Sequence, residues 1–89
     1  MQNDRLGLDV IARHVDERSA DYVALSDRIW GLPELAFEEH RSAEEQIALL
    51  EREGFRITRN VAGIPTAFIA EAGQGGPIVG ILGEYDALP

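Results

Sequence analysis

The hydrophobic positions in the first third of the chain recur at the spacing of an α-helix. From about Leu8 to Trp30 they share one broad stripe, and charged residues fill much of the remaining circumference. The residues of this stripe are Leu8, Ile11, Ala12, Val15, Tyr22, Leu25 and Ile29. Gly31 and Pro33 are expected to end the helix, which at 1.5 Å per residue would be roughly 35 Å long. A helix of this length with so broad a stripe requires an extensive surface to cover.

A second helix is predicted over about Glu38 to Glu53, with Gly54 ending it. Acidic residues crowd its first half, where they favour the positive end of the helix dipole. If the helix begins at Ser42, that residue and Glu45 would form a capping box. The residues expected on its buried side are Ile47 and Leu50.

Three strands are predicted in the second half of the chain. The segment Phe55–Thr58 alternates apolar and polar residues, Thr66–Ala70 follows a Gly-Pro turn, and Ile78–Leu82 is a short apolar run typical of a buried strand. The glycine-rich residues 73–76 are expected to join the last two strands as a hairpin. A phosphate-binding loop is disfavoured here, because such a loop leads into a helix. Two helices followed by three strands indicate an α/β fold class.

Composition and charge restrict the function. The chain has 89 residues, a net charge of −8 and no cysteine. The charge disfavours nucleic acid and anionic membranes, whose phosphates repel it. Without cysteine there is neither a disulfide nor a thiolate ligand, which fits the cytoplasm. There is no secretory signal, and no apolar run approaches a membrane span. The chain is therefore predicted to be one small domain, or part of one.

The candidate chemistry lies directly after the third predicted strand, at Glu84 and Asp86. Side chains two residues apart in a strand point to the same side, so these carboxylates could face one site. Open α/β sheets place ligands at the carboxyl ends of their strands. A pair of acids there suits a divalent cation or the orientation of a metal-bound histidine, although a polar turn is the alternative. His14 and His40 are expected to be surface residues, since neither has a partner at metal-binding spacing.

Several ordered blocks of the sequence resemble the N-terminal segment of the aminoacylase/carboxypeptidase-type metallohydrolases, a family that includes p-aminobenzoyl-glutamate hydrolases. The blocks are Ile29–Glu39, Ser42, Leu50–Phe55, Gly63–Ala67 and Leu82–Pro89. The resemblance covers nearly all of the chain from about Tyr22 onward.

This resemblance implies a two-domain enzyme several times longer than 89 residues. Residues 1–89 would be an incomplete N-terminal part of its zinc-peptidase-like catalytic domain, without the lid domain that drives dimerisation. One or two divalent ions, zinc or manganese, would activate a water molecule, with a glutamate as general base. The reaction would release an amino acid from an N-acyl or N-aroyl conjugate such as p-aminobenzoyl-glutamate. The enzyme would be a homo- or hetero-oligomer acting on a small molecule.

By the same resemblance, Asp86 matches the aspartate that orients a metal-bound histidine, and Glu84 occupies the position of a possible direct metal ligand. The remaining ligands and the base would lie beyond Pro89, so the isolated chain is predicted to bind no metal and to lack activity. The alternative is a non-catalytic acidic interaction module, whose long first helix docks on a partner, or a truncated remnant.

Overall fold

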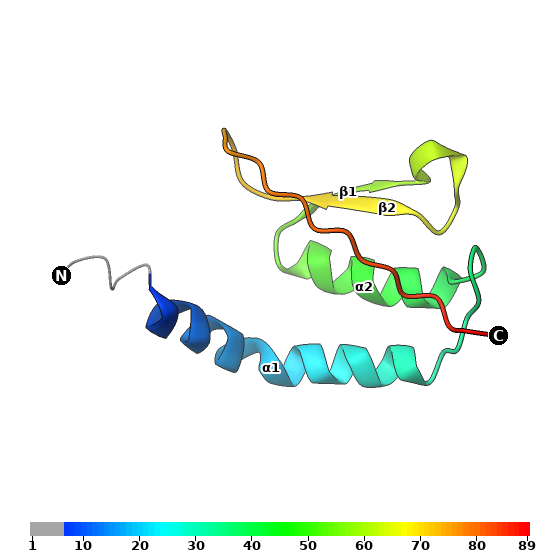
Figure 1. The fold of residues 1–89 in the computed structure, drawn as a ribbon, viewed down its shortest axis with the longest axis horizontal. Helices are drawn as coiled ribbons and strands as arrows, with labels where there is room; N and C mark the ends of the chain where they lie inside the picture. The colour runs from blue at the N-terminus through cyan, green and yellow to red at the C-terminus, as the bar shows by residue number, and fades with distance from the viewer. Residues whose placement is uncertain (1–6) are drawn as a thin grey trace.

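The computed structural model describes residues 7–89 as two helices beside a two-stranded antiparallel sheet (Figure 1). The elements are α1 (Leu8–Trp30), α2 (His40–Arg52), β1 (Arg56–Arg59), a short 3₁₀ turn (Val61–Gly63) and β2 (Phe68–Glu71). Both expected helices and the first two expected strands are confirmed, with boundaries shifted by at most two residues. The arrangement is compatible with part of an α/β domain. No helix in the described range is long and apolar enough to cross a lipid bilayer.

The core is small and centred on α2. Its buried apolar side chains are Ala43, Ile47 and Leu49, while Leu50 is half-buried. The sheet lies against α2, with Phe55 and Ile57 half-buried and their polar neighbours exposed, as the alternating pattern predicts.

The N-terminal and C-terminal ends of α2 are capped in different ways. The condition for a capping box, a helix that begins at Ser42, is not met, because the helix begins at His40 and Glu45 pairs instead with Arg28 on α1. At the other end, the N–H groups of Gly54 and Phe55 donate to the carbonyls of Glu51 and Leu50. This is a Schellman motif, and Gly54 takes the left-handed conformation that it needs, with φ of 95°. The predicted end of the helix at Gly54 is confirmed.

Arginine–glutamate pairs connect α2 to the elements around it. Arg18 and Arg28 of α1 contact Glu53 and Glu45 at 3.0 and 2.5 Å. Arg59 of β1 binds both carboxylate oxygens of Glu44, which lowers the pKa of Glu44. Exposed pairs of this kind contribute about 0–1 kcal/mol each. Part of the acidic charge thus pairs with arginines of neighbouring elements, at a small gain in stability, in addition to maintaining solubility.

The third predicted strand is wrong. Ile78, Val79, Ile81 and Leu82 lie in extended but irregular chain and are between 83 and 94% exposed. The hairpin therefore joins β1 to β2, with Arg56 opposite Glu71 and Arg59 opposite Phe68. A strand exists only where a neighbour completes its hydrogen-bond ladder, and no described segment pairs with residues 78–82. The turn at Gly73 and Gly75 is present, but it leads into this unpaired segment.

Helix α1 is also incompletely covered. None of its residues is buried, and only Leu25 and Ile29 from the predicted stripe are half-buried. Leu8, Ile11 and Val15 are 82, 54 and 53% exposed. The accessible surface of the chain is 7187 Å², whereas a compact monomer of this mass would expose roughly 5200 Å². The described fold therefore leaves much apolar surface open.

Candidate functional site

Three loops that are distant in the sequence meet near the N-terminal end of α2: residues 31–39, residues 64–67 and the C-terminal residues 83–89 (Figure 1). The backbone N–H of Ala87 donates to the carbonyl of Glu34 at 2.7 Å. The hydroxyl of Tyr85 donates to the carbonyl of Thr66 at 2.6 Å. These two bonds hold the backbone on both sides of Asp86. The fold thus brings together three of the sequence blocks that carry the resemblance.

Glu34 supplies the cap that α2 lacks locally. Its two carboxylate oxygens accept the backbone N–H groups of Ser42 at 2.8 Å and Arg41 at 3.3 Å. These donors lie in the first turn of α2, where N–H groups have no partner within the helix and where negative charge is favoured. The hydrogen bond from Ser42 and the nearby charge of Arg41 lower the pKa of Glu34. Ser42 itself is fully buried, with its hydroxyl donating to the carbonyl of Leu32, as expected of a structural residue.

Glu34→Gln is expected to remove part of the acid sensitivity of the fold. Because the pKa of Glu34 is lowered on folding, its contribution to stability is present above its ordinary value of 4.5 and is lost as the pH falls through the lower folded value. Acid titration followed by circular dichroism at 222 nm measures this. Glu38→Gln, an exposed carboxylate in the same loop, is the control with the same change in charge. Identical acid transitions in the two variants would contradict the role of Glu34.

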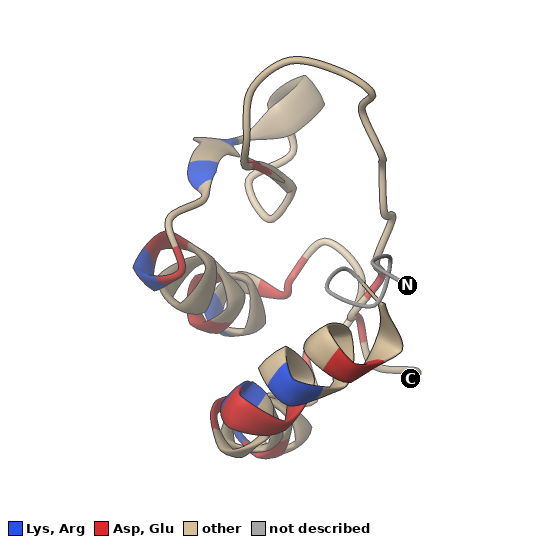
Figure 2. Cartoon of the chain, turned by 90° about the vertical axis from the view of Figure 1, so that its left-hand side faces the viewer, with Lys and Arg blue, Asp and Glu red and all other residues tan. Residues whose placement is uncertain are grey.

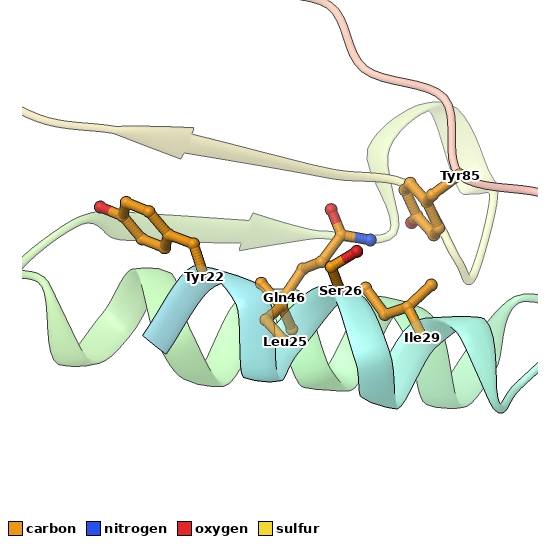
Figure 3. A pocket seen from close by; sticks show the side chains of 6 residues that line it. All are labelled: Tyr22, Leu25, Ser26, Ile29, Gln46 and Tyr85. Carbon is orange, nitrogen blue, oxygen red and sulfur yellow. The ribbon is translucent and has the colours of Figure 1, made fainter. Parts of the chain in front are cut away.

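Tyr85 connects the C-terminal segment to the interior. Its ring lies 6.4 Å from that of Phe68, centroid to centroid. It also lines one end of an open groove of about 280 Å³ between α1 and α2, shown in Figure 3. The other residues that line the groove are Tyr22, Leu25, Ser26, Ile29 and Gln46. Burial, and secondarily the negative charge of Glu39, raises the pKa of the Tyr85 hydroxyl. Tyr85 is thus a neutral hydrogen-bond donor at ordinary pH.

Tyr85→Phe is expected to destabilise the chain by about 1 kcal/mol, because the carbonyl of Thr66 loses its donor in a buried residue. Urea denaturation followed by circular dichroism measures the change in the free energy of unfolding. Tyr22→Phe is the control, since the structure records no hydrogen bond from that hydroxyl within residues 7–89. An equal loss of unfolding free energy in both variants would show that the hydrogen bond from Tyr85 to Thr66 does not stabilise the chain.

Glu84 and Asp86 are both exposed, while Tyr85 and Ala87 between and beside them are half-buried. This alternation is what extended backbone produces, so the two carboxylates do lie on the outward side of the segment. Within residues 7–89 there is no group of three or more His, Cys, Asp or Glu side chains that could bind a metal ion. Two exposed carboxylates are too few ligands for zinc or manganese. The residues in this range therefore do not fit a complete metal site.

The remaining candidates have structural or surface roles. His14 is exposed, with its Nδ1 3.4 Å from Arg18, and His40 is the exposed first residue of α2, as expected. One carboxylate oxygen of Glu39 is buried without a hydrogen-bond partner in the described structure. Sequence reasoning missed the parts of Glu34 and Tyr85 in the site. The available sequence signal for Tyr85 was an aromatic residue between two acids, Glu84 and Asp86. Glu34 had no such signal, because it binds a helix that begins only at His40.

Comparison with curated proteins finds three relatives. One is a subunit of the p-aminobenzoyl-glutamate hydrolase of Escherichia coli, to which the chain is 55% identical over 67 residues, or 75% of its length. The other two are Xaa-Arg dipeptidases. The chain is 42% identical to the Mus musculus protein over 88 residues and 37% identical to the Homo sapiens protein over 91 residues, and each match covers 88% of this chain.

These matches cover only a small part of the relatives, 14% of the E. coli protein and about a fifth of the two dipeptidases. No model of a known protein family matches the chain, and no solved structure matches it. The expected resemblance is nevertheless confirmed, because the relatives are a subunit of a p-aminobenzoyl-glutamate hydrolase and two dipeptidases. The chain is an evident relative of the E. coli p-aminobenzoyl-glutamate hydrolase and the Xaa-Arg dipeptidases, and corresponds to one segment of them.

Proposed function

We propose that this chain forms part of an amidohydrolase that releases an amino acid from an N-acyl or N-aroyl conjugate, of the p-aminobenzoyl-glutamate type. The observation that supports this most is the junction of Glu34, Thr66, Tyr85 and Ala87, which fixes the backbone around Asp86 and leaves its carboxylate exposed. The identity of 55% to the E. coli hydrolase supports the choice of substrate class.

In the proposed enzyme Asp86 positions another group. A carboxylate whose two neighbouring residues are both held by hydrogen bonds can accept the ring N–H of a histidine and so fix the orientation of that ring. A zinc or manganese ion belongs to the proposal, with Glu84 as a candidate ligand. Since the described residues do not form a metal site, its other ligands must come from outside them. The isolated chain is therefore proposed to be inactive.

The proposed partners are a small acyl-amino acid substrate and further protein subunits. The E. coli relative is named as a subunit, which supports an oligomeric enzyme. The net charge of −8 disfavours nucleic acid and anionic lipid. We propose the cytoplasm as the compartment, which the lack of cysteine supports.

A chimera tests this function. The matched segment of the E. coli hydrolase is replaced by the corresponding residues of this chain, and release of p-aminobenzoate from p-aminobenzoyl-glutamate is measured with zinc or manganese added. Turnover by the chimera, and none by the same hydrolase with the segment deleted, is the expected result. A chimera that folds, as judged by circular dichroism and by its size in solution, but does not turn over would overturn the proposal.

A further inference from the structure

Glu34 connects helix α2 to the C-terminal segment of the chain. Its two carboxylate oxygens accept the backbone N–H groups of Ser42 at 2.8 Å and Arg41 at 3.3 Å, in the first turn of α2. Its backbone carbonyl accepts the N–H of Ala87 at 2.7 Å, and its own N–H donates to the carbonyl of Leu32 at 2.7 Å. The polar groups of both its side chain and its backbone are therefore engaged.

The C-terminal segment has few other attachments. Within residues 77–89, only Tyr85 and Ala87 form hydrogen bonds with other described residues. Residues 72–83 carry no charge and so form no ion pair, and in Figure 2 the long stretch from β2 toward the C-terminus is free of charged positions. Asp86 lies between the two attached residues. Its position therefore depends on how firmly their hydrogen-bond acceptors are held.

The two acceptors are held in different ways. The carbonyl that accepts from Tyr85 belongs to Thr66, a buried residue that is 5% exposed. The carbonyl that accepts from Ala87 belongs to Glu34, in a loop outside the helices and strands. A carboxylate that binds two N–H groups restricts the rotation of its own backbone, and charge-assisted hydrogen bonds of this kind are strong. Negative charge is also favoured at the N-terminal end of α2. The side chain of Glu34 therefore orients the carbonyl of the same residue.

We propose that Glu34 is a positioning residue of the enzyme: its carboxylate, bound to the first turn of α2, directs its backbone carbonyl to the N–H of Ala87 and so fixes the position of the Asp86 carboxylate. The role in turnover rests on the proposed function, whereas the coupling between the Glu34 side chain and the Ala87 N–H does not. Glu34 acts through the backbone and has no contact with substrate in this scheme. Its loss should therefore lower kcat more than it changes KM.

Hydrogen exchange in the 89-residue chain, measured by nuclear magnetic resonance, tests the coupling. Glu34→Ala removes both acceptor oxygens of the side chain but keeps the backbone carbonyl. We expect the Ala87 N–H to exchange about tenfold faster in this variant, relative to the N–H groups of residues 47–50 in α2. Glu34→Gln keeps one acceptor oxygen and should give an intermediate rate. Glu38→Ala removes an exposed carboxylate from the same loop and should leave exchange at Ala87 unchanged.

Two results of this experiment would overturn the coupling. One is unchanged exchange at Ala87 in Glu34→Ala. The other is an equal rise in exchange at Ala87 and at residues 47–50, because that would show only a general loss of stability. If Glu34→Ala does not fold, the same comparison between Glu34→Gln and Glu38→Gln decides the question.

The chimera with the E. coli hydrolase tests the role in turnover. Glu34→Ala should lower kcat for the release of p-aminobenzoate by about tenfold or more, with KM changed by less than about twofold, and Glu34→Gln should recover part of the loss. Equal kcat values for the Glu34→Ala and Glu38→Ala chimeras would rule out the positioning role. An unmodified chimera that folds but is inactive would overturn the proposed function, and exchange at Ala87 would still decide the coupling because it requires no turnover.

Discussion

Ile47→Ala is expected to destabilise the chain by about 2–4 kcal/mol. Ile47 is only 3% exposed and is one of three buried apolar side chains among the described residues, so little around it can collapse into the space that a smaller residue leaves. Domains of this length have a total stability of roughly 4–13 kcal/mol, and the open surface of this one favours the lower end. Urea denaturation followed by circular dichroism at 222 nm measures the loss.

The matched control for Ile47 is Ile69→Ala on β2, which removes the same atoms from a side chain that is 47% exposed. Its expected cost is below about 1 kcal/mol, because much of that side chain is already in water. Equal losses in the two variants would mean that the core is not centred on α2.

Asp86→Ala is expected to lower the turnover or the metal affinity of the chimera by about 10–100-fold, the usual effect of removing a carboxylate that orients a metal ligand. The variant should leave the fold intact, since Asp86 is exposed and its backbone is held by neighbouring residues. Steady-state hydrolysis of p-aminobenzoyl-glutamate and titration with zinc give the two quantities.

Glu51→Ala is the control for Asp86, because it removes an exposed carboxylate from α2, away from the junction of the three loops. The chimera that carries Glu51→Ala should turn over substrate as fast as the unmodified chimera. If Asp86→Ala also leaves both turnover and metal affinity unchanged, Asp86 does not belong to the site.

The helices were predictable because their information is local. The spacing of apolar residues in α1 and α2 and the glycine after α2 determine where these helices run and where the second one ends. The alternation in residues 55–58 likewise predicts β1 as a half-buried strand. These elements depend on contacts between residues that are close in the sequence, or on one broad apolar face. The sequence shows both features directly.

The errors arose where a distant partner decides the outcome. A capping box of Ser42 and Glu45 was expected if the helix began at Ser42, but it begins at His40, and Glu34 reaches its first turn from the preceding loop. The third strand was predicted from its apolar side chains, but a strand also needs neighbours for its peptide groups. Among the described residues none is available to segment 78–82.

The candidate site shows the same division. The sequence alone pointed to Glu84 and Asp86 through their position after an apolar run, and to a hydrolase through its ordered blocks, a resemblance that the relatives confirm. Only the tertiary structure identified Glu34 and Tyr85 as the residues that hold this segment in place. Periodicity and motif spacing are properties of neighbouring residues, whereas a hydrogen bond between Glu34 and Ala87, which are far apart in the sequence, exists only once the chain has folded.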